Sequence, residues 1–372
     1  WVSNKLPRHQ NMLRNGMSDL EIKNVEWNNV IDAIEECYSL GWTDGLPVVP
    51  PEQYRVQEFI DYVQRDPDEI LGEVPERRRQ ISVLKAAANA VMAGCLPEYF
   101  PVVAAATEAM LTPDFNLIGP SSSQGGAGIL VVVNGPISRE IGMNSKDNLF
   151  GPGNRANATI GRAIRLILMN ACGAIPGLFD RTNIGHPGKY TYCIAENELE
   201  THWDPLHVER GFKKDQNAVT VLAAWEPRQV RSASDKYAAL DSLIDVASTL
   251  GTSLANDDSV AGNGSLVRQG QLMITFAGAS EFWEGWSKDD VREYIYPKIR
   301  RSVGDLKRVQ AIAGEYQDGD DERYALLVPA PEDILMVYAG SPQATGYRSA
   351  VIHSELPKVS STAVTLEIKH PV

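Results

Sequence analysis

Three short apolar runs that each end at a glycine constrain the fold of this chain more than any other feature. They are ILVVVNGP (129–136), LMITFAGA (272–279) and ILMVYAGS (334–341). Apolar runs without polar alternation are typical of strands buried on both faces. A glycine at a strand end lets a ligand or another backbone approach closely. The shared pattern suggests an internal repeat of strand-glycine units. The alternative is that buried strands of α/β proteins resemble one another, since the spacings are unequal and the flanks differ.

Segments with helical spacing of apolar residues alternate with these runs. We expect helices within 28–42, 51–65, 81–95, 97–111, 150–173 (after a glycine-rich loop), 237–254 and 291–301, and further strands within 190–197 and 217–227. This alternation predicts an α/β fold, with a mixed or largely parallel sheet and helices on its faces. Residues 1–25 are polar and irregular and indicate an N-terminal arm. Residues 26–372 form a single large domain, or two lobes divided near 213–235.

Composition excludes several classes of protein. The 372 residues carry a net charge of −13, which argues against a non-specific nucleic-acid binder. No apolar run reaches about 18 residues, so we expect no membrane span. The four cysteines show no zinc-type or disulfide-scaffold spacing, which favours a cytoplasmic protein. The sequence begins at Trp1 without a methionine, so it leaves open whether a leader precedes it.

The segment GPGNRANATIGRAIR (151–165) is the first candidate site. A glycine-rich loop that enters a helix offers free N–H groups and a favourable dipole to an anion. Arginine can bind a carboxylate with two parallel hydrogen bonds. The alternative is ordinary helix capping with surface arginines. The candidate ligands of a small anionic substrate here are Gly153, Asn154, Arg155, Asn157, Thr159 and Arg162.

The segment from Gly185 to Arg210 is the second candidate site, because it contains three of the six histidines. Its candidate catalytic residues are His186, Lys189, Cys193, Glu196, His207 and Glu209, and Asn134 and Asn197 are added as ligands at two strand ends. A nucleophilic Cys193 requires a thiol pKa lowered by a nearby cation; the favoured alternative is a small buried hydrophobe. Cys193 and Glu196 can act together only if their strand stops at Ala195.

Two further segments are candidates. In GWTDGLPVVPP (41–51), Asp44 is an acid, a base or a substrate ligand, or it only makes the turn. In SSSQGGAG (121–128), N–H groups and hydroxyls could bind an oxyanion, although a flexible linker before a strand is the favoured interpretation.

Several long blocks carry a family resemblance: GWTDGLPVVPP, NAVMAGCLPEYFPVV, GPGNRANATIGRAIRL, HPGKYTYCIAEN and PLHVERGF. Together they resemble an uncharacterised family of bacterial proteins, often encoded near a small protein with a UGSC motif that contains selenocysteine or cysteine. The resemblance implies an enzyme, or an enzyme subunit, that works with a thiol or selenol partner protein. It implies no catalytic residue.

We therefore expect a soluble enzyme that cleaves or rearranges a small carboxylate- or amide-bearing molecule. A hydrolase or lyase is favoured because no nicotinamide, flavin or P-loop fingerprint occurs in the sequence. One alternative is a non-catalytic subunit of a redox complex. Another is a metal-dependent hydrolase that uses His186, His207 and Glu209. We expect a homo- or hetero-oligomer and no cofactor, with a divalent metal as the alternative.

Overall fold

Two four-stranded sheets form the centre of the molecule, and each packs one face on the other. The computed structural model describes residues 29–232, 235–249, 270–343 and 347–369. The predicted arm at 1–25 and the end of the predicted helix at 250–254 lie outside the described residues.

The first sheet has the order β12-β5-β3-β4. Its strands are β3 (Gly128–Asn134), β4 (Cys193–Ala195), β5 (Ala218–Ala224) and β12 (Val364–Glu367). Strand β3 is parallel to β4 and antiparallel to β5, and β5 is antiparallel to β12.

The second sheet has the order β10-β7-β11-β6. Its strands are β6 (Arg228–Ser232), β7 (Leu272–Ala277), β10 (Ile334–Tyr338) and β11 (Tyr347–His353). Strand β7 is parallel to β10 and antiparallel to β11, and β11 is antiparallel to β6. Both sheets are therefore mixed, and of the two predicted alternatives the mixed sheet is the one observed.

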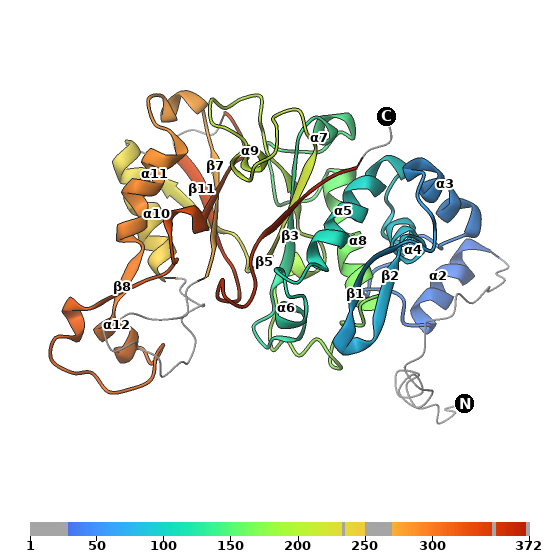
Figure 1. Ribbon diagram of the computed structural model, residues 1–372, viewed down its shortest axis with the longest axis horizontal. Coiled ribbons are helices and arrows are strands. Elements are labelled where there is room, and N and C mark those ends of the chain that lie inside the picture. The colour runs from blue at the N-terminus through green and yellow to red at the C-terminus, as the bar shows by residue number, and fades with distance from the viewer. Residues whose placement is uncertain (1–28, 233–234, 250–269, 344–346, 370–372) are drawn as a thin grey trace.

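Alternation along the strands explains why the molecule has four layers, because successive side chains of a strand point to opposite faces. Leu130 and Val132 of β3 pack with Met273 and Val337 of the second sheet in a core between the sheets. Val131 packs instead with helices of the first half. Figure 1 shows the resulting order: helices, the second sheet, the first sheet, helices.

The outer layers contain helices with wide apolar faces. Next to the first sheet lie α4 (Val83–Ala93), α5 (Phe100–Met110) and α8 (Arg155–Asn170), with α2 (Val30–Ser39) and α3 (Gln53–Val63) farther out. Next to the second sheet lie α10 (Lys236–Thr249) and α11 (Lys288–Ile295), with α12 (Val303–Arg308) nearby. Short elements complete the fold: β1 (Ile70–Val74), β2 (Arg79–Ser82), α6 (Ile118–Ser122), α7 (Ile137–Glu140), α9 (Leu206–Glu209), β8 (Arg300–Ser302) and β9 (Tyr324–Leu326).

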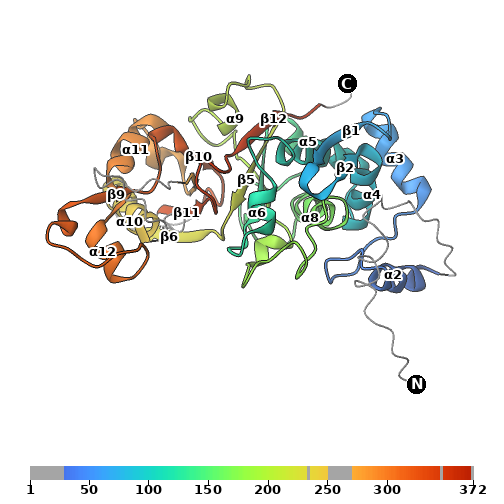
Figure 2. The same cartoon turned by 60° about the horizontal axis from the view of Figure 1, so that its bottom comes forward.

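The two sheets share one pattern of pairing and exchange their fourth strands. After β5 in the first sheet, the chain crosses directly to β6, an edge strand of the second sheet. After β11 in the second sheet, it returns to β12, an edge strand of the first sheet. Figure 2 shows β12 running across the molecule toward α5. The predicted repeat of strand-glycine units stays a prediction.

Some predicted boundaries need correction. The strand predicted within 190–197 covers only Cys193–Ala195, and Ser121 and Ser122, predicted as loop, end the short helix α6. Within the described part of the chain, no helix combines the length and the hydropathy that a membrane span requires.

Candidate functional site

The polar side chains at the start of α8 are engaged within the fold. Asn154 caps the helix by accepting the N–H of Asn157 at 3.0 Å, and the Thr159 hydroxyl donates to the carbonyl of Arg155 at 2.8 Å. The Arg155 guanidinium donates twice to the Gly94 carbonyl, each at 3.0 Å. Gly153 has a φ of 124°, which suits glycine at this turn. This loop therefore holds α8 against the end of α4.

Asp44 and Arg162, predicted at separate sites, bind each other. The guanidinium donates to both oxygens of Asp44, each at 2.8 Å, and also to the carbonyl of Pro47 at 2.9 Å. The same carboxylate accepts the N–H of Leu46 at 3.2 Å, as an aspartate in a turn does. The pair fixes the proline-rich segment on α8.

Cys193 lies in the core between β4 and the helices, where burial raises the pKa of its thiol. Strand β4 ends at Ala195, so Glu196 comes directly after it. This is the arrangement that Cys193 and Glu196 would need in order to act together. The thiolate is the reactive form of cysteine, and a raised pKa keeps it scarce at neutral pH.

We predict that all four thiols are unreactive in the native protein. All are free and buried, and burial raises the pKa of Cys37 to about 11 and those of Cys95 and Cys172 to about 12. A chromogenic disulfide reagent should label them slowly under native conditions and rapidly in denaturant. A fast-reacting native thiol, identified by peptide mapping, would contradict this prediction.

Five of the predicted residues meet at one place, which we call the carboxylate cluster; all of its members except Glu209 are buried. Its members are Asn134, Glu196, Asn197, Glu198, His207, Glu209 and Lys288. The Asn134 amide donates to Glu196 at 2.7 Å and to Glu198 at 3.0 Å. Lys288 of α11 donates to Glu209 at 2.9 Å and lies 3.7 Å from Glu196.

The carboxylate cluster connects the two halves of the molecule. Glu196, which follows β4, accepts the backbone N–H of Tyr338 in β10 at 3.1 Å, and Asn197 N–H donates to the Tyr338 carbonyl at 2.8 Å. Burial raises the pKa of Glu196, although the charge of Lys288 and three hydrogen bonds offset part of that effect. Both ring nitrogens of His207 are buried without a hydrogen-bond partner in the described structure.

His186 lies at the opposite end of the first sheet from His207. Its Nδ1 accepts the N–H of Gly188 at 3.2 Å, and its Nε2 lies 3.2 Å from the Ala224 carbonyl. The length of β3, about 20 Å at the usual rise per residue, separates this end from Asn134 and the carboxylate cluster. Among the described residues, no group of three or more His, Cys, Asp or Glu side chains is arranged to hold a metal ion.

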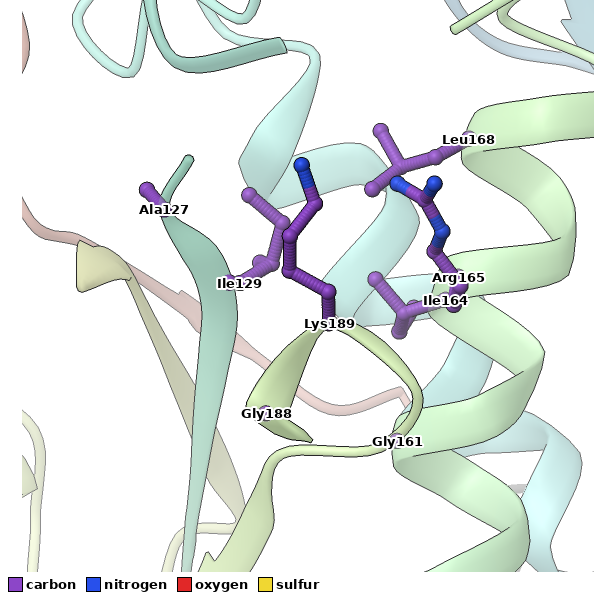
Figure 3. A pocket seen from close by; sticks show the side chains of 9 residues that line it. Ala127, Ile129, Gly161, Ile164, Arg165, Leu168, Gly188 and Lys189 are labelled. Atoms are coloured by element: carbon purple, nitrogen blue, oxygen red, sulfur yellow. The ribbon is translucent and has the colours of Figure 1, made fainter. Parts of the chain in front are cut away.

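A shallow pocket lies beside His186, between β3, α8 and the 3₁₀ turn Pro187–Lys189 (Figure 3). The pocket is small: the space that water-sized molecules can occupy in it is about 10 Å³. Its lining consists of four apolar residues, three glycines and two cations: Ala127, Ile129, Ile164 and Leu168; Gly128, Gly161 and Gly188; Arg165 and Lys189. Figure 3 shows the side chains of Arg165 and Lys189 extending to the same side of the pocket.

The two cations of the pocket share one carboxylate, that of Asp180. Arg165 donates to Asp180 at 3.1 Å, and the Lys189 ammonium lies 2.9 and 3.0 Å from its two oxygens. Lys189 also donates to the Thr182 hydroxyl at 2.6 Å, and that hydroxyl donates to Asp180 at 2.6 Å. The Thr182 oxygen is therefore held between a cation and an anion, and its side chain is only half-buried.

The electrostatics of this group leave positive charge available. Burial alone would raise the pKa of Asp180. Hydrogen bonds from Thr182 and Lys189, with the charges of Lys189 and Arg165, outweigh burial and set the pKa below its ordinary value. Arg165 uses one N–H on Asp180, and its remaining N–H groups have no hydrogen-bond partner within the described ranges. Two cations that share one ionised carboxylate leave an excess charge of +1 for an incoming anion.

Sequence reasoning identified Lys189 but missed Asp180 and Thr182. The signal available was DRTN (180–183), because an aspartate two residues before a threonine commonly forms a side-chain turn. Here the Thr182 N–H does donate to Asp180 at 3.2 Å. That pattern does not show that Lys189 and Arg165 meet the same turn.

Comparison with protein-family models finds none that matches the chain, and comparison with curated proteins finds no match either. The assignment of function therefore rests on the geometry of the two polar groups, the carboxylate cluster and the pocket.

Proposed function

We propose that this protein is a hydrolase that cleaves an acyl bond, an amide or an ester, in a small molecule that also carries a carboxylate. One observation supports this proposal above all others. The Thr182 hydroxyl lies 2.6 Å from the Lys189 ammonium and 2.6 Å from Asp180, beside a pocket that holds Arg165, most of whose N–H groups have no partner among the described residues. A hydroxyl next to a proton acceptor and a group that orients it is the arrangement of nucleophilic catalysis.

In the proposed reaction, the Thr182 oxygen attacks the substrate carbonyl while its proton passes to Asp180. The leaving amine or alcohol takes up that proton, and an acyl group remains on the Thr182 oxygen. A water molecule then attacks the acyl group, and its proton returns to the Thr182 oxygen through the same carboxylate. The Lys189 ammonium compensates the charge of Asp180 and directs the lone pairs of the Thr182 oxygen.

Arg165 has the role of carboxylate ligand in this proposal. Its free N–H groups can form two parallel hydrogen bonds to a substrate carboxylate. When the substrate attracts Arg165, Asp180 loses one of the cations that hold its pKa down, and it becomes a better proton acceptor. In this proposal, the short aliphatic chain between the carboxylate and the reacting carbonyl lies against the apolar residues Ile129, Ile164 and Leu168, which line the pocket.

The test uses p-nitrophenyl hydrogen succinate, a small ester with a free carboxylate. We expect the purified chain to release nitrophenolate and to form an acyl adduct that peptide mapping places on Thr182. Arg165→Gln should raise KM about 10-fold or more, because a charged hydrogen-bond partner of the carboxylate is lost.

The matched control for that variant is Arg155→Gln, whose guanidinium binds the Gly94 carbonyl far from Thr182. It should leave KM unchanged. Absence of both turnover and acyl adduct with the ester, and with the corresponding amide succinamate, would overturn the proposed function.

Location and partners belong to this proposal as well. We place the protein in a reducing, cytoplasmic compartment, because its four cysteines are all free. The thiol or selenol partner protein and the oligomeric assembly stay predictions. The metal-dependent alternative has no support, because His186 and His207 lie at opposite ends of β3.

A further inference from the structure

The glycine-rich segment Gly125–Gly128 packs directly on the loop that carries Thr182. A Cβ atom at Gly126 would lie 2.4 Å from the Thr182 methyl carbon and 2.9 Å from Cα of Gly185. Gly126 also has a φ of 97°, a conformation that other residues rarely adopt. The two segments are tied together where the Asn183 N–H donates to the Gln124 carbonyl at 3.0 Å. The backbone of Gly126 thus lies next to the proposed nucleophile.

Two backbone N–H groups beside Thr182 have no acceptor among the residues that the structure describes. Gly126 is buried, and no hydrogen-bond partner for its N–H is found in the described part of the chain. Gly185 is half-buried, and its N–H also has no partner among the described residues; its Cβ position would lie 3.2 Å from the Thr182 methyl carbon. Buried N–H groups are almost always paired, so an unpaired one beside a reactive group calls for an acceptor that arrives with the ligand.

Glu355 holds the segment in this position. Its carboxylate accepts the N–H of Ala127, and a Cβ atom at Gly125 would lie 2.5 Å from its Oε1. Glu355 is buried at the end of β11, which fixes the segment to the second sheet. The N–H groups therefore do not need to reorganise when charge develops next to them.

We propose that the backbone N–H groups of Gly126 and Gly185 form an oxyanion hole for the carbonyl that Thr182 attacks. This inference rests on the proposed function, and it adds the groups that stabilise the negative charge on the substrate oxygen. Attack by the Thr182 oxygen moves an electron pair onto the carbonyl oxygen, and the two N–H groups stabilise that negative oxygen. Collapse of the tetrahedral intermediate returns the electron pair and expels the leaving group.

The experiment replaces the Gly126 N–H by an ester oxygen, with glycolic acid introduced at position 126 by nonsense suppression. This change keeps the backbone shape and adds no Cβ. We expect kcat for p-nitrophenyl hydrogen succinate to fall about 100-fold or more, with little change in KM. Inhibition by 3-boronopropanoate, which forms a tetrahedral adduct with a hydroxyl, should weaken by a similar factor. Inhibition by succinate, which forms no adduct, should not change.

The matched control places glycolic acid at Gly125, whose N–H is bonded to the Ser123 hydroxyl at 3.0 Å. It perturbs the same segment and should keep most of the activity. Equal kcat and equal boronate inhibition in the Gly126 ester variant and the natural chain would overturn the oxyanion hole while leaving the Thr182 nucleophile in place. If the natural chain shows neither turnover nor a boronate adduct at Thr182, both proposals fail.

Discussion

Replacement of Thr182 by valine should lower kcat/KM for p-nitrophenyl hydrogen succinate by about 1,000-fold or more, because the nucleophile is removed while the shape of the side chain is kept. Valine retains the methyl contacts with Gly126 and Gly185. Binding of succinate, measured by calorimetry, should stay close to that of the natural chain, since Arg165 and Lys189 remain. The acyl adduct on residue 182 should disappear.

Thr182→Ser is the conservative partner of this variant. It keeps the hydroxyl between Lys189 and Asp180 but loses the methyl group that packs on the two glycines. We expect it to recover a substantial part of the activity that valine abolishes, and to form the acyl adduct again. If Thr182→Val keeps more than about a tenth of the natural kcat/KM, Thr182 is not the nucleophile.

The loss of stability caused by replacing Thr182 can be measured separately from the loss of catalysis. Loss of the hydroxyl removes its hydrogen bond to Asp180 and the one that it accepts from Lys189, which together should cost about 3 kcal/mol in the free energy of unfolding. A chain destabilised by that amount remains folded at 25 °C. Urea denaturation of each variant therefore shows whether a loss of activity reflects unfolding or chemistry.

The sequence predicted several strands that are buried on both faces, but it missed β11, which is buried along most of its length. The runs of β3, β7 and β10 are apolar segments, and all three form strands: β3 and β7 inside their sheets and β10 at the edge of the second sheet. The strand RQVRS of β6 was missed, and the helix predicted within 291–301 was wrong at its end, where Arg300 and Arg301 begin β8; the charged residues of both strands lack any apolar pattern. Those strands form only because neighbouring strands supply their hydrogen-bond partners.

The site was predicted only where a single segment contains its residues. Lys189 was identified from its own segment. Asp180 and Thr182 can be recognised as site residues only in the folded protein, where their loop contacts Lys189 and Arg165. Asp44 and Arg162 were singled out separately, although they bind each other across 118 positions of the sequence. Pairings of this kind depend on tertiary structure and leave no local signal.

Replacement of Lys288 by methionine should have the largest effect on stability, a loss of about 3–5 kcal/mol in the free energy of unfolding. Lys288 is buried, donates to Glu209 at 2.9 Å and to the Met336 carbonyl at 2.8 Å, and offsets the buried charge of Glu196. Methionine fills a similar volume but leaves the buried Glu196 without that cation, while Glu209 keeps its ion pair with Arg292 at 2.8 Å. Urea denaturation at pH 7 measures the loss.

Two comparisons make this prediction specific. Lys146→Met removes an exposed lysine that pairs with Glu200, and it should cost no more than about 1 kcal/mol. Glu196→Gln combined with Lys288→Met should be less unstable than the sum of the two single losses, because the lysine is no longer needed to offset that charge.

The pH dependence of the Lys288→Met protein follows from the pKa of Glu196, which burial raises. A raised pKa means that the folded state binds the proton more tightly than the unfolded state does. The contribution of Glu196 therefore favours folding below its ordinary pKa and is lost as the pH rises through the raised value. Without Lys288 that pKa rises further, so the stability deficit of the variant should shrink as the pH falls from 7 toward about 5. A deficit that stays constant over this range, or a loss below about 1 kcal/mol at pH 7, would show that Lys288 does not hold the two sheets together through the carboxylate cluster.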